Sequence, residues 1–394
     1  MSIPLEIISH VFSFLQSDPT TLAICSRAHP SFSPFTECLL YADVVVLDDK
    51  GNIRDKKDDR QIFLASDLHK LLIDSPHIAK YIRKIEICLS SYHATGIAPI
   101  LPMLLSLDGI FVTATFYASW QSLSAEFLNA FANRVLSLKE VSINYFDCFP
   151  LRLFDGCETL KSIGLNTWSG EERNENDSQV IPQALDSLSL FSWQPCSPYS
   201  NSMFMAWAKK RIHSLRFLLF HSSNGRAVNE VLPELLRMCS DSLSSLELNL
   251  SDGYHIPMDV DLSSVPHLKD LTIRSNLRED ITSLDLRYLC AFPAIIKLLE
   301  TTICLDNLTL KISNAPWSRE LQFNLTDWSS LLTFFSRSSD KFRHIQLQLC
   351  HITSETGPLI PSVDTLPRLY NSEIVKELMA KGILDICSEE WKLY

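Results

Sequence analysis

Two cysteine–histidine pairs are the residues of this chain whose types and spacing could hold a metal ion. Cys25 and His29 are four residues apart, which would place them on one face of a helix, and Cys350 and His351 are adjacent. Structural zinc sites usually need four such ligands. Neither pair has a second pair beside it in the sequence, so a place in the core or in a structural motif is favoured. We expect no metal site.

Glycine is scarce, and its scarcity argues against the common nucleotide and hydrolase sites. Only 10 of the 394 residues are glycine, against a usual share of about 7%. Phosphate-binding loops and nucleophile elbows need glycine for close approach of the backbone, and none of their motifs occurs. We therefore expect neither an active site nor a cofactor, although a catalytic triad assembled only in the folded chain would escape such a search.

The composition bounds the class of protein. The formal net charge is -11 and the hydrophobic fraction is 46%, so the chain is expected to fold without offering the basic face that nucleic-acid binding needs. Its 11 cysteines form no Cys-x-x-Cys pair. Neither a signal peptide nor an apolar run long enough for a membrane span is evident. We expect the cytoplasm, the nucleus or both.

The first forty-five residues are predicted to form three short helices. Residues 4–15 carry apolar side chains over an arc of roughly 180°, wider than the stripe of about 100° that a surface helix needs. A second helix begins with Asp18 as N-cap and Pro19 at its first position, and Phe32, Phe35, Leu39 and Leu40 belong to a third. So short a segment cannot bury all this apolar surface. Either the rest of the chain, which the helices would cap, or a partner must cover it.

These residues also resemble an F-box. The resemblance rests on Ile3-Pro4-Leu5-Glu6-Ile7-Ile8, on Val11-Phe12-Ser13-Phe14-Leu15, on Leu22, and on Cys25-Ser26 followed by Ser31-Phe32. Ile3 and Phe32 replace the usual Leu and Trp, and His29-Pro30 replaces a common Cys-Arg. The resemblance, which extends to fungal F-box proteins with degenerate leucine-rich repeats, implies docking onto the Skp-type adaptor subunit of a cullin–RING ubiquitin ligase. The contacts it implies are Pro4, Ile7, Ile8, Val11, Leu15, Leu22 and Phe32.

A recurring unit, apolar-x-x-apolar-x-apolar, fills most of the remaining chain. Its instances start at Ile82, Leu107, Leu138, Leu160, Leu185, Leu215, Leu243, Leu268, Leu305 and Phe342. Most spacings lie in or near the period of about 20–29 residues of leucine-rich repeats, and the last two are long enough to indicate insertions or an unseen repeat. Amphipathic segments follow the instances, among them 126–136, 204–212, 228–239 and 329–335. A short strand followed by a helix, repeated, is typical of a solenoid.

The predicted fold class is therefore an α/β solenoid, in which a three-helix F-box-like module precedes an irregular leucine-rich-repeat horseshoe with a parallel sheet on its concave face. The usual Asn of these repeats appears only as Asn276, so the repeats are degenerate; an ordinary α/β protein is the alternative. The predicted parts are the module (1–45), a charged linker and leading helix (46–80), the solenoid (81–352) and a C-terminal cap (353–394) with a helix over 372–390. The runs 48–60 and 171–177 are predicted to be solvated loops.

A binding surface is expected where strand residues alternate away from the core. Glu140, Ser142 and Asn144 would point outward in one repeat, and Phe191, Phe217 and Leu219 would form an aromatic centre, which an insertion could also cover. Exposed aromatic side chains are favoured anchors of protein interfaces. The residues predicted to bind a partner are Trp168, Phe191, Trp193, Phe217, His221, Arg274 and Lys311.

Three functions remain open at this point. The first is a substrate-recognition adaptor of a Skp–cullin–F-box type ubiquitin ligase, whose solenoid binds a target protein. The second is a repeat scaffold with no ligase role, whose N-terminal helices only cap the array. The third is an enzyme with an unrecognised site. Whether the first helix keeps an exposed apolar face in the folded chain separates the first two.

Overall fold

The computed structural model describes residues 5–15, 18–48, 60–90, 94, 96–147, 149–166, 184–191, 198–221, 225–250, 260–277, 292–314, 328–354 and 369–393. The chain divides into two compact units, Met1–Gln183 and Ala184–Tyr394. In each unit an open parallel sheet carries helices, which makes the fold α/β as predicted. No helix in the described ranges is long and apolar enough to cross a membrane.

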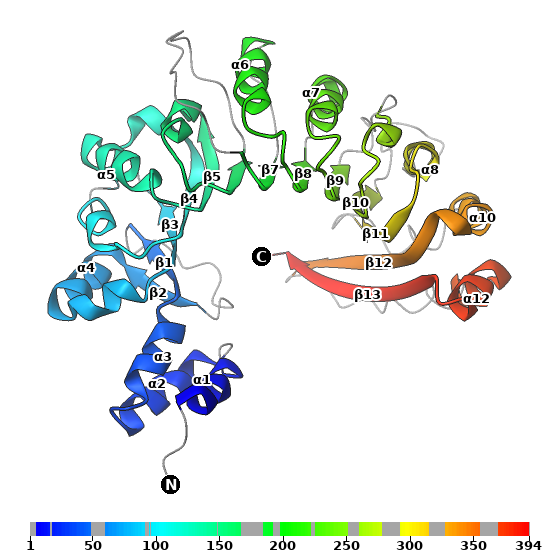
Figure 1. The fold of residues 1–394 in the computed structure, drawn as a ribbon. Helices are drawn as coiled ribbons and strands as arrows, with labels where there is room; N and C mark the ends of the chain where they lie inside the picture. Colours follow the sequence, from blue (N-terminus) through cyan, green and yellow to red (C-terminus); the bar gives the residue numbers. More distant parts are fainter. Residues whose placement is uncertain are drawn as a thin grey trace. The chain divides into compact units, whose positions relative to one another are not determined.

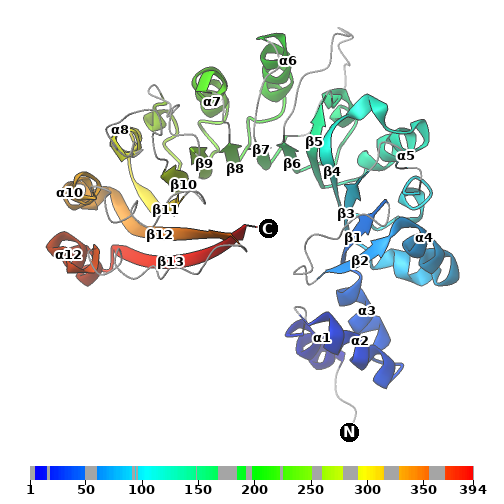
Figure 2. The same cartoon turned by 180° about the vertical axis from the view of Figure 1, so that it is seen from behind.

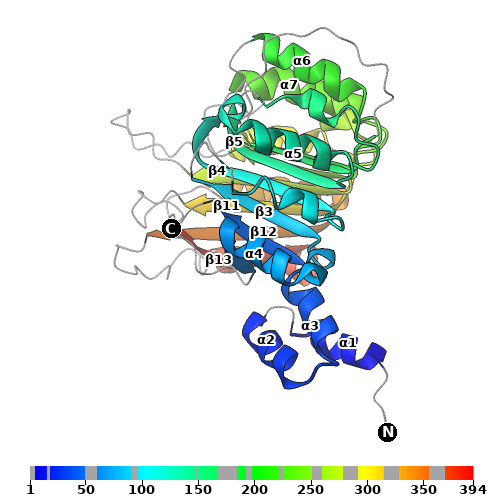
Figure 3. The same cartoon turned by 90° about the vertical axis from the view of Figure 1, so that its left-hand side faces the viewer.

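The first unit begins with three short helices and continues into a parallel sheet. Its strands run in the order β6-β5-β4-β3-β1-β2. Figure 3 looks onto α4 and α5, with the strands behind them. The helices are α1 (Leu5–Ser13), α2 (Pro19–Ala28), α3 (Ser33–Leu40), α4 (Ala65–Asp74) and α5 (Ala125–Val135). The strands are β1 (Asp43–Leu47), β2 (Gln61–Leu64), β3 (Lys84–Leu89), β4 (Gly109–Ser119), β5 (Glu140–Asp147) and β6 (Ser162–Asn166).

The second unit repeats a strand and a helix along the chain. Its strands run in the order β13-β12-β11-β10-β9-β8-β7, and its helices all lie on one face of them (Figure 1 and Figure 2). The strands are β7 (Ser187–Phe191), β8 (Phe217–His221), β9 (Ser245–Leu250), β10 (Asp270–Leu277), β11 (Leu305–Asn314), β12 (Phe342–Ser354) and β13 (Leu384–Leu393). The helices are α6 (Pro198–Lys209), α7 (Gly225–Met238), α8 (Phe292–Glu300), α10 (Ser329–Arg337) and α12 (Glu373–Ala380).

The apolar anchors of the predicted repeats form the core. All ten instances coincide with strands β3 to β12. Leu138, Val141 and Ile143 are buried, while Ser142 and Asn144, each of which follows a buried residue of the strand, are only half-buried. The same alternation holds at Leu243, Leu246 and Leu248 in the second unit. The predicted parallel sheet and the predicted register are therefore both confirmed.

A backbone ladder joins successive repeats at the points where their strands begin. The carbonyl of Asp108 accepts hydrogen bonds from the N–H groups of Lys139 and Glu140, and the carbonyl of Lys139 accepts from Lys161 and Ser162. The second unit has the same arrangement, in which Arg216 accepts from the two residues that start the next repeat. One carbonyl of a repeat thus accepts hydrogen bonds from two N–H groups of the next repeat. Buried backbone groups need such hydrogen-bond partners.

Hydroxyl groups extend this ladder in three repeats. Thr159 donates to the carbonyl of Leu138 (2.8 Å), and Ser242 donates to that of Leu215 (2.9 Å). Ser214 does the same to Leu185. Each hydroxyl belongs to the residue just before an anchor leucine. Near the end of β5, at the position where a regular leucine-rich repeat has Asn, Phe146 is buried against Trp120, with ring centroids 5.3 Å apart. Side-chain packing replaces the amide there.

The predicted linker and C-terminal cap contain strands that the repeat pattern did not identify. Strand β1 starts just before residue 46 and β2 follows within the segment predicted to be a linker. The helix predicted over 372–390 ends at Ala380, and β13 follows it. Gly382 stops the helix: its φ is +70°, its N–H donates to the carbonyl of Met379 (2.9 Å), and the N–H of Ile383 donates to that of Leu378 (3.0 Å). This pair of hydrogen bonds is the Schellman motif, which favours glycine.

The long spacings near the C-terminus are insertions. β10 pairs directly with β11, and β11 pairs directly with β12, each in parallel register. Because each strand pairs directly with the next, no further described strand stands between them, and the long spacings do not reflect an unseen repeat within the sheet.

Candidate protein-interaction sites

The three N-terminal helices have a small core of their own. Phe12, Leu22 and Leu40 are buried together, one from each helix. Phe32 packs edge-on against Phe12, with ring centroids 5.4 Å apart. Asp18 caps α2 as predicted, because its carboxylate accepts a hydrogen bond from the N–H of Thr21 at 2.9 Å. The helices are therefore a closed module rather than a loose extension of the sheet.

An apolar row remains exposed on this module. Ile7 and Val11 are each 53% exposed and Phe14 is 73% exposed. They lie on or just after α1 at spacings of four and three residues, which places them along one side of a helix. Ile24 of α2 is exposed as well. We call Ile7, Val11, Phe14 and Ile24 the exposed row. A module that leaves four large apolar side chains exposed offers a surface that a partner can cover.

The residues implied by the F-box resemblance divide into two groups. Ile7 and Val11 belong to the exposed row. Ile8, Leu15 and Phe32 pack against the core of the module, and Leu22 is fully buried in it. Pro4 lies outside the described residues. Leu22 thus supports the module from within and does not face a partner.

The third helix attaches the module to the sheet of the first unit. It leads through Tyr41 into β1, and the ring of Tyr41 stacks on Phe63 of β2 at 6.3 Å between centroids. Glu37 of α3 pairs with His77, Oε2 to Nε2, at 3.4 Å. Figure 3 shows α3 next to the sheet, with α1 and α2 beyond it. The residues of the exposed row belong to α1, the turn after it and α2, whereas the contacts of this attachment come from α3 and Tyr41.

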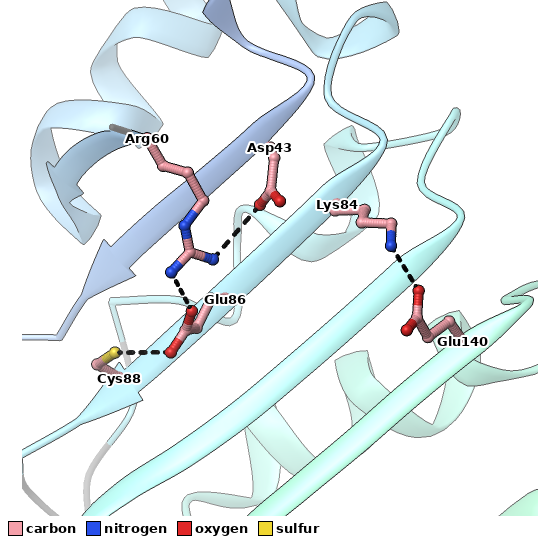
Figure 4. Close-up of polar contacts among 6 residues, drawn as sticks. All are labelled: Asp43, Arg60, Lys84, Glu86, Cys88 and Glu140. Atoms are coloured by element: carbon pink, nitrogen blue, oxygen red, sulfur yellow. Dashed lines mark hydrogen bonds and ion pairs between the residues drawn. The ribbon is translucent and has the colours of Figure 1, made fainter. Parts of the chain in front are cut away.

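The face of the first sheet opposite its helices carries a network of ion pairs (Figure 4). Arg60, just before the edge strand β2, contacts Glu86 of β3 at 2.7 Å and Asp43 of β1 at 3.7 Å. Residues 48–60 were predicted to be a solvated loop, and this prediction was wrong for both ends. Arg60 is bound to the sheet, and Asp48 accepts hydrogen bonds from Ser90.

A second ion pair crosses a whole strand on the same face. Lys84 of β3 and Glu140 of β5 are both in register with Gly109 of β4, which lies between them. Because Gly109 has no side chain, the Lys84 ammonium reaches Glu140 at 2.7 Å over a span of two strands, about 10 Å between backbones. The same ammonium lies 5.6 Å from the centre of the Phe111 ring. A signal for this network was present in the alternation of β3, where Lys84 and Glu86 point outward between buried isoleucines.

Cys88 lies beside this network and is a poor nucleophile. Its thiol donates to Glu86 at 3.8 Å. Burial, and then the negative charge of Glu86, raise the pKa of Cys88 to about 12. Burial likewise raises the pKa of Cys239 to about 12. Both side chains therefore remain protonated thiols at neutral pH, and the thiolate that nucleophilic chemistry requires is not available.

The corresponding face of the second sheet presents a different set of side chains. Phe191, Phe217 and Leu219 are half-buried near its β7 end. His221, Asn249, Arg274, Lys311 and Gln348 lie side by side in parallel register and form one column of this face. Apolar and aromatic side chains therefore lie near the β7 end of this face, and Arg274 and Lys311 lie further along it. Trp168 and Trp193 lie outside the described residues.

The basic end of this column is partly neutralised within the sheet. The Arg274 guanidinium donates through Nε to the Glu247 carboxylate on the neighbouring strand. On the next pair of strands, Asn307 donates to Asp270 at 2.6 Å. Lys311 stands in register between Arg274 and Gln348. Of the two basic residues predicted to bind a partner, Arg274 therefore has a partner already.

The two cysteine–histidine pairs are not brought into a metal site. The His29 ring lies 2.6 Å from the Ser31 hydroxyl and 5.7 Å from the centre of the Phe32 ring, and Cys350 is buried in β12. Among the described residues, no group of three or more His, Cys, Asp or Glu side chains is arranged to hold a metal ion.

Comparison with protein-family models, curated proteins and solved structures found no match to this chain.

Proposed function

We propose that this protein is a substrate-recognition adaptor of a Skp–cullin–F-box type ubiquitin ligase. The observation that carries the proposal is the exposed row on a module that already has a closed core. A module that only capped the sheet would turn its apolar side toward the strands. Here the attachment is made by α3, and Ile7, Val11 and Phe14 remain in water. Covering such half-exposed side chains stabilises a complex by roughly 1 kcal/mol each.

The finer description of the fold belongs to this proposal. The helices are an F-box-like module and the strand–helix units are degenerate leucine-rich repeats that form an irregular horseshoe. The anchor leucines, the parallel register and the ladder between repeats support that description. The described cysteines are all free thiols, consistent with a reducing compartment such as the cytoplasm or nucleus.

The target protein would bind the outward face of the repeats, and the protein itself would perform no catalysis. Phe191 and Phe217 are the proposed anchors, and truncating either to Ala should weaken target binding by roughly 1–3 kcal/mol. Lys311 is expected to contribute more to association than Arg274, because Arg274 is paired with Glu247. Wild-type affinity in both phenylalanine variants would place the target elsewhere.

The docking proposal is tested with the full-length chain and a purified Skp-type adaptor. Ile7→Asp combined with Val11→Asp places two charges in the proposed interface, where an unpaired buried charge is costly. Binding measured by calorimetry should be lost. Ile8 is left unchanged, because it packs on the core of the module and its replacement would unfold the helices.

Ile73→Asp is the matched control. Ile73 is an exposed apolar residue of α4 in the same unit. The Ile73→Asp variant should bind the adaptor as the unaltered chain does, and circular dichroism should show that every variant is folded. Undiminished binding by the Ile7 and Val11 double variant, or no binding by the unaltered chain, would overturn the proposal in favour of a scaffold without a ligase role.

A further inference from the structure

Five residues at the start of the strands in the first unit form a surface patch apart from the sites above. Arg83, Asp108 and Lys139 each follow an anchor residue directly, and the backbone ladder places them in a row on neighbouring strands. Leu105 and Leu136 each stand two residues before an anchor, in the turns that lead into β4 and β5. We call these five residues the turn patch. It lies at the end of the sheet where β3, β4 and β5 begin; Figure 3 shows these strands.

The turn patch has more positive than negative charge. Lys139 Nζ lies 2.9 Å from one oxygen of Asp108, and Arg83 Nη1 lies 3.8 Å from the other. Two cations thus share one carboxylate, and both keep more than half of their side chains exposed. The chain as a whole carries a net charge of -11. A local positive surplus on such a protein attracts acidic groups in particular.

The two leucines supply an apolar contact beside these charges. Leu105 is 80% exposed and Leu136 is 47% exposed. Single exposed leucines are common and need no explanation. These two occupy equivalent positions of consecutive repeats. The Arg83 guanidinium donates to the carbonyl of Ser106 at 3.1 Å, which holds the charge against the turn that carries Leu105.

We propose that the turn patch docks a short segment of a partner protein in which acidic side chains alternate with apolar ones. The apolar side chains would cover Leu105 and Leu136, and a carboxylate would complete the coordination of Arg83 and Lys139. Aliphatic leucines offer no ring on which a nucleic-acid base could stack. Neither the adaptor nor the target of the proposed ligase is needed for this interaction.

The test uses the full-length chain and a fluorescent synthetic peptide, Gly-Asp-Leu-Glu-Asp-Leu-Gly, followed by fluorescence anisotropy. Leu105→Ser combined with Leu136→Ser should raise the Kd about tenfold. Lys139→Glu should also weaken binding and should flatten its dependence on salt. Both changes are at exposed positions, so circular dichroism and the thermal midpoint should remain those of the unaltered chain.

Matched controls come from α4 of the same unit. Ile73→Ser removes an apolar side chain whose exposure lies between those of Leu105 and Leu136, and Lys70→Glu reverses an exposed charge. Both should bind the peptide with unchanged Kd. A peptide with Ser in place of Leu, and a single-stranded oligothymidine, should both bind more weakly than the first peptide. If the Ser-substituted peptide or the oligothymidine bound as tightly as the first peptide, the patch would be a site for any polyanion, and the proposed peptide specificity would be wrong. No binding of the first peptide, or no response to the leucine and lysine changes, would overturn the proposal.

Discussion

The N-terminal module and the strand–helix repeats contain similar apolar side chains but bury them differently. In a repeat, an anchor such as Leu246 is fully covered, because the next repeat packs against it. In the module, Phe12 is covered by the other two helices, whereas Val11, its neighbour in the chain, is half in water. The module is not one of the repeats, so no equivalent unit packs against Val11 within the chain. An apolar pattern therefore indicates how much surface must be buried, and the tertiary contacts determine which residues bury it.

The two regions also differ in how they satisfy polar groups. Repeats are joined by carbonyls and hydroxyls that reach from one unit to the next, as from Ser242 to Leu215. The module satisfies its backbone locally, as Asp18 does for Thr21. Local hydrogen bonds leave a small module free to present its surface to another protein, and the longer-range ones make neighbouring repeats depend on one another.

The largest expected effect is on the burial of the anchors. Leu246→Ala leaves a cavity in a packed core and should lower the free energy of unfolding by about 2–5 kcal/mol. Val11→Ala removes an exposed group and should change it by less than about 0.5 kcal/mol. The free energy of unfolding of both variants is measured by urea denaturation. Similar losses in both would mean that Val11 is covered by the chain itself.

The next effect is on the ladder between repeats. Ser242→Ala leaves the carbonyl of Leu215 without its hydroxyl donor and should cost about 1 kcal/mol. Ser137→Ala is the control, since Ser137 also precedes an anchor but its hydroxyl donates only within its own turn, to Arg134. Hydrogen exchange of β8 and β9 should quicken in the first variant only. Equal exchange in both variants would show that this hydroxyl does not couple the repeats.

A smaller effect is expected at the edge of the first sheet. Arg60→Gln removes the ion pairs with Glu86 and Asp43, which are partly exposed and therefore screened by water. The loss should be about 0.5–1 kcal/mol, and it should shrink in high salt. Lys70→Gln on α4 should have no effect. The loss of stability is measured by hydrogen exchange of the β2 amides at low and high salt. A loss that does not depend on salt would mean that the aliphatic part of Arg60 stabilises the edge by packing instead.

The smallest effect concerns the cap of α2. The hydroxyl and the N–H of Thr21 hold the pKa of Asp18 below its ordinary value of 3.8. A carboxylate with a depressed pKa in the folded chain stabilises it at pH values above the unfolded pKa. This contribution is lost as the pH falls through the folded pKa. Protection of the α2 amides, corrected for intrinsic exchange, should therefore decline below about pH 4. Asp18→Asn keeps the cap but should remove that decline. A decline of the same size in the variant would assign it to another group.

The strands β3 to β12 could be predicted from the sequence, and β1, β2 and β13 could not. Each predicted strand carries or follows an apolar anchor that the neighbouring repeat covers, as Leu138 precedes β5. By the register of the sheets, the position equivalent to an anchor is Tyr41 before β1 and Lys381 before β13. Those positions have less to cover them, so the apolar pattern is weaker there. The helix stop at Gly382 also had a signal in the sequence, a glycine after the last helical turn, but the helix predicted over 372–390 ran past it.

The candidate sites show the same division. The outward residues of the second sheet, among them Phe217 and Lys311, followed from the alternation of single strands. The pairs Arg60–Glu86 and Lys84–Glu140 join strands that are far apart in the sequence, and their formation depends on which strands become neighbours. Leu22 was placed at an interface by its position in a motif, and the packing of three helices buries it instead.

By itself, the sequence determined the alternation of strands and helices, the face of each strand that enters the core, and the apolar surplus of the first helices. These are local properties, since they arise from the period of the backbone and the polarity of nearby side chains. Only the tertiary structure decided which apolar residues of the module stay in water, and which charges meet across Gly109. Those outcomes depend on contacts between distant segments, whose distances are set when the strands pair and the helices pack.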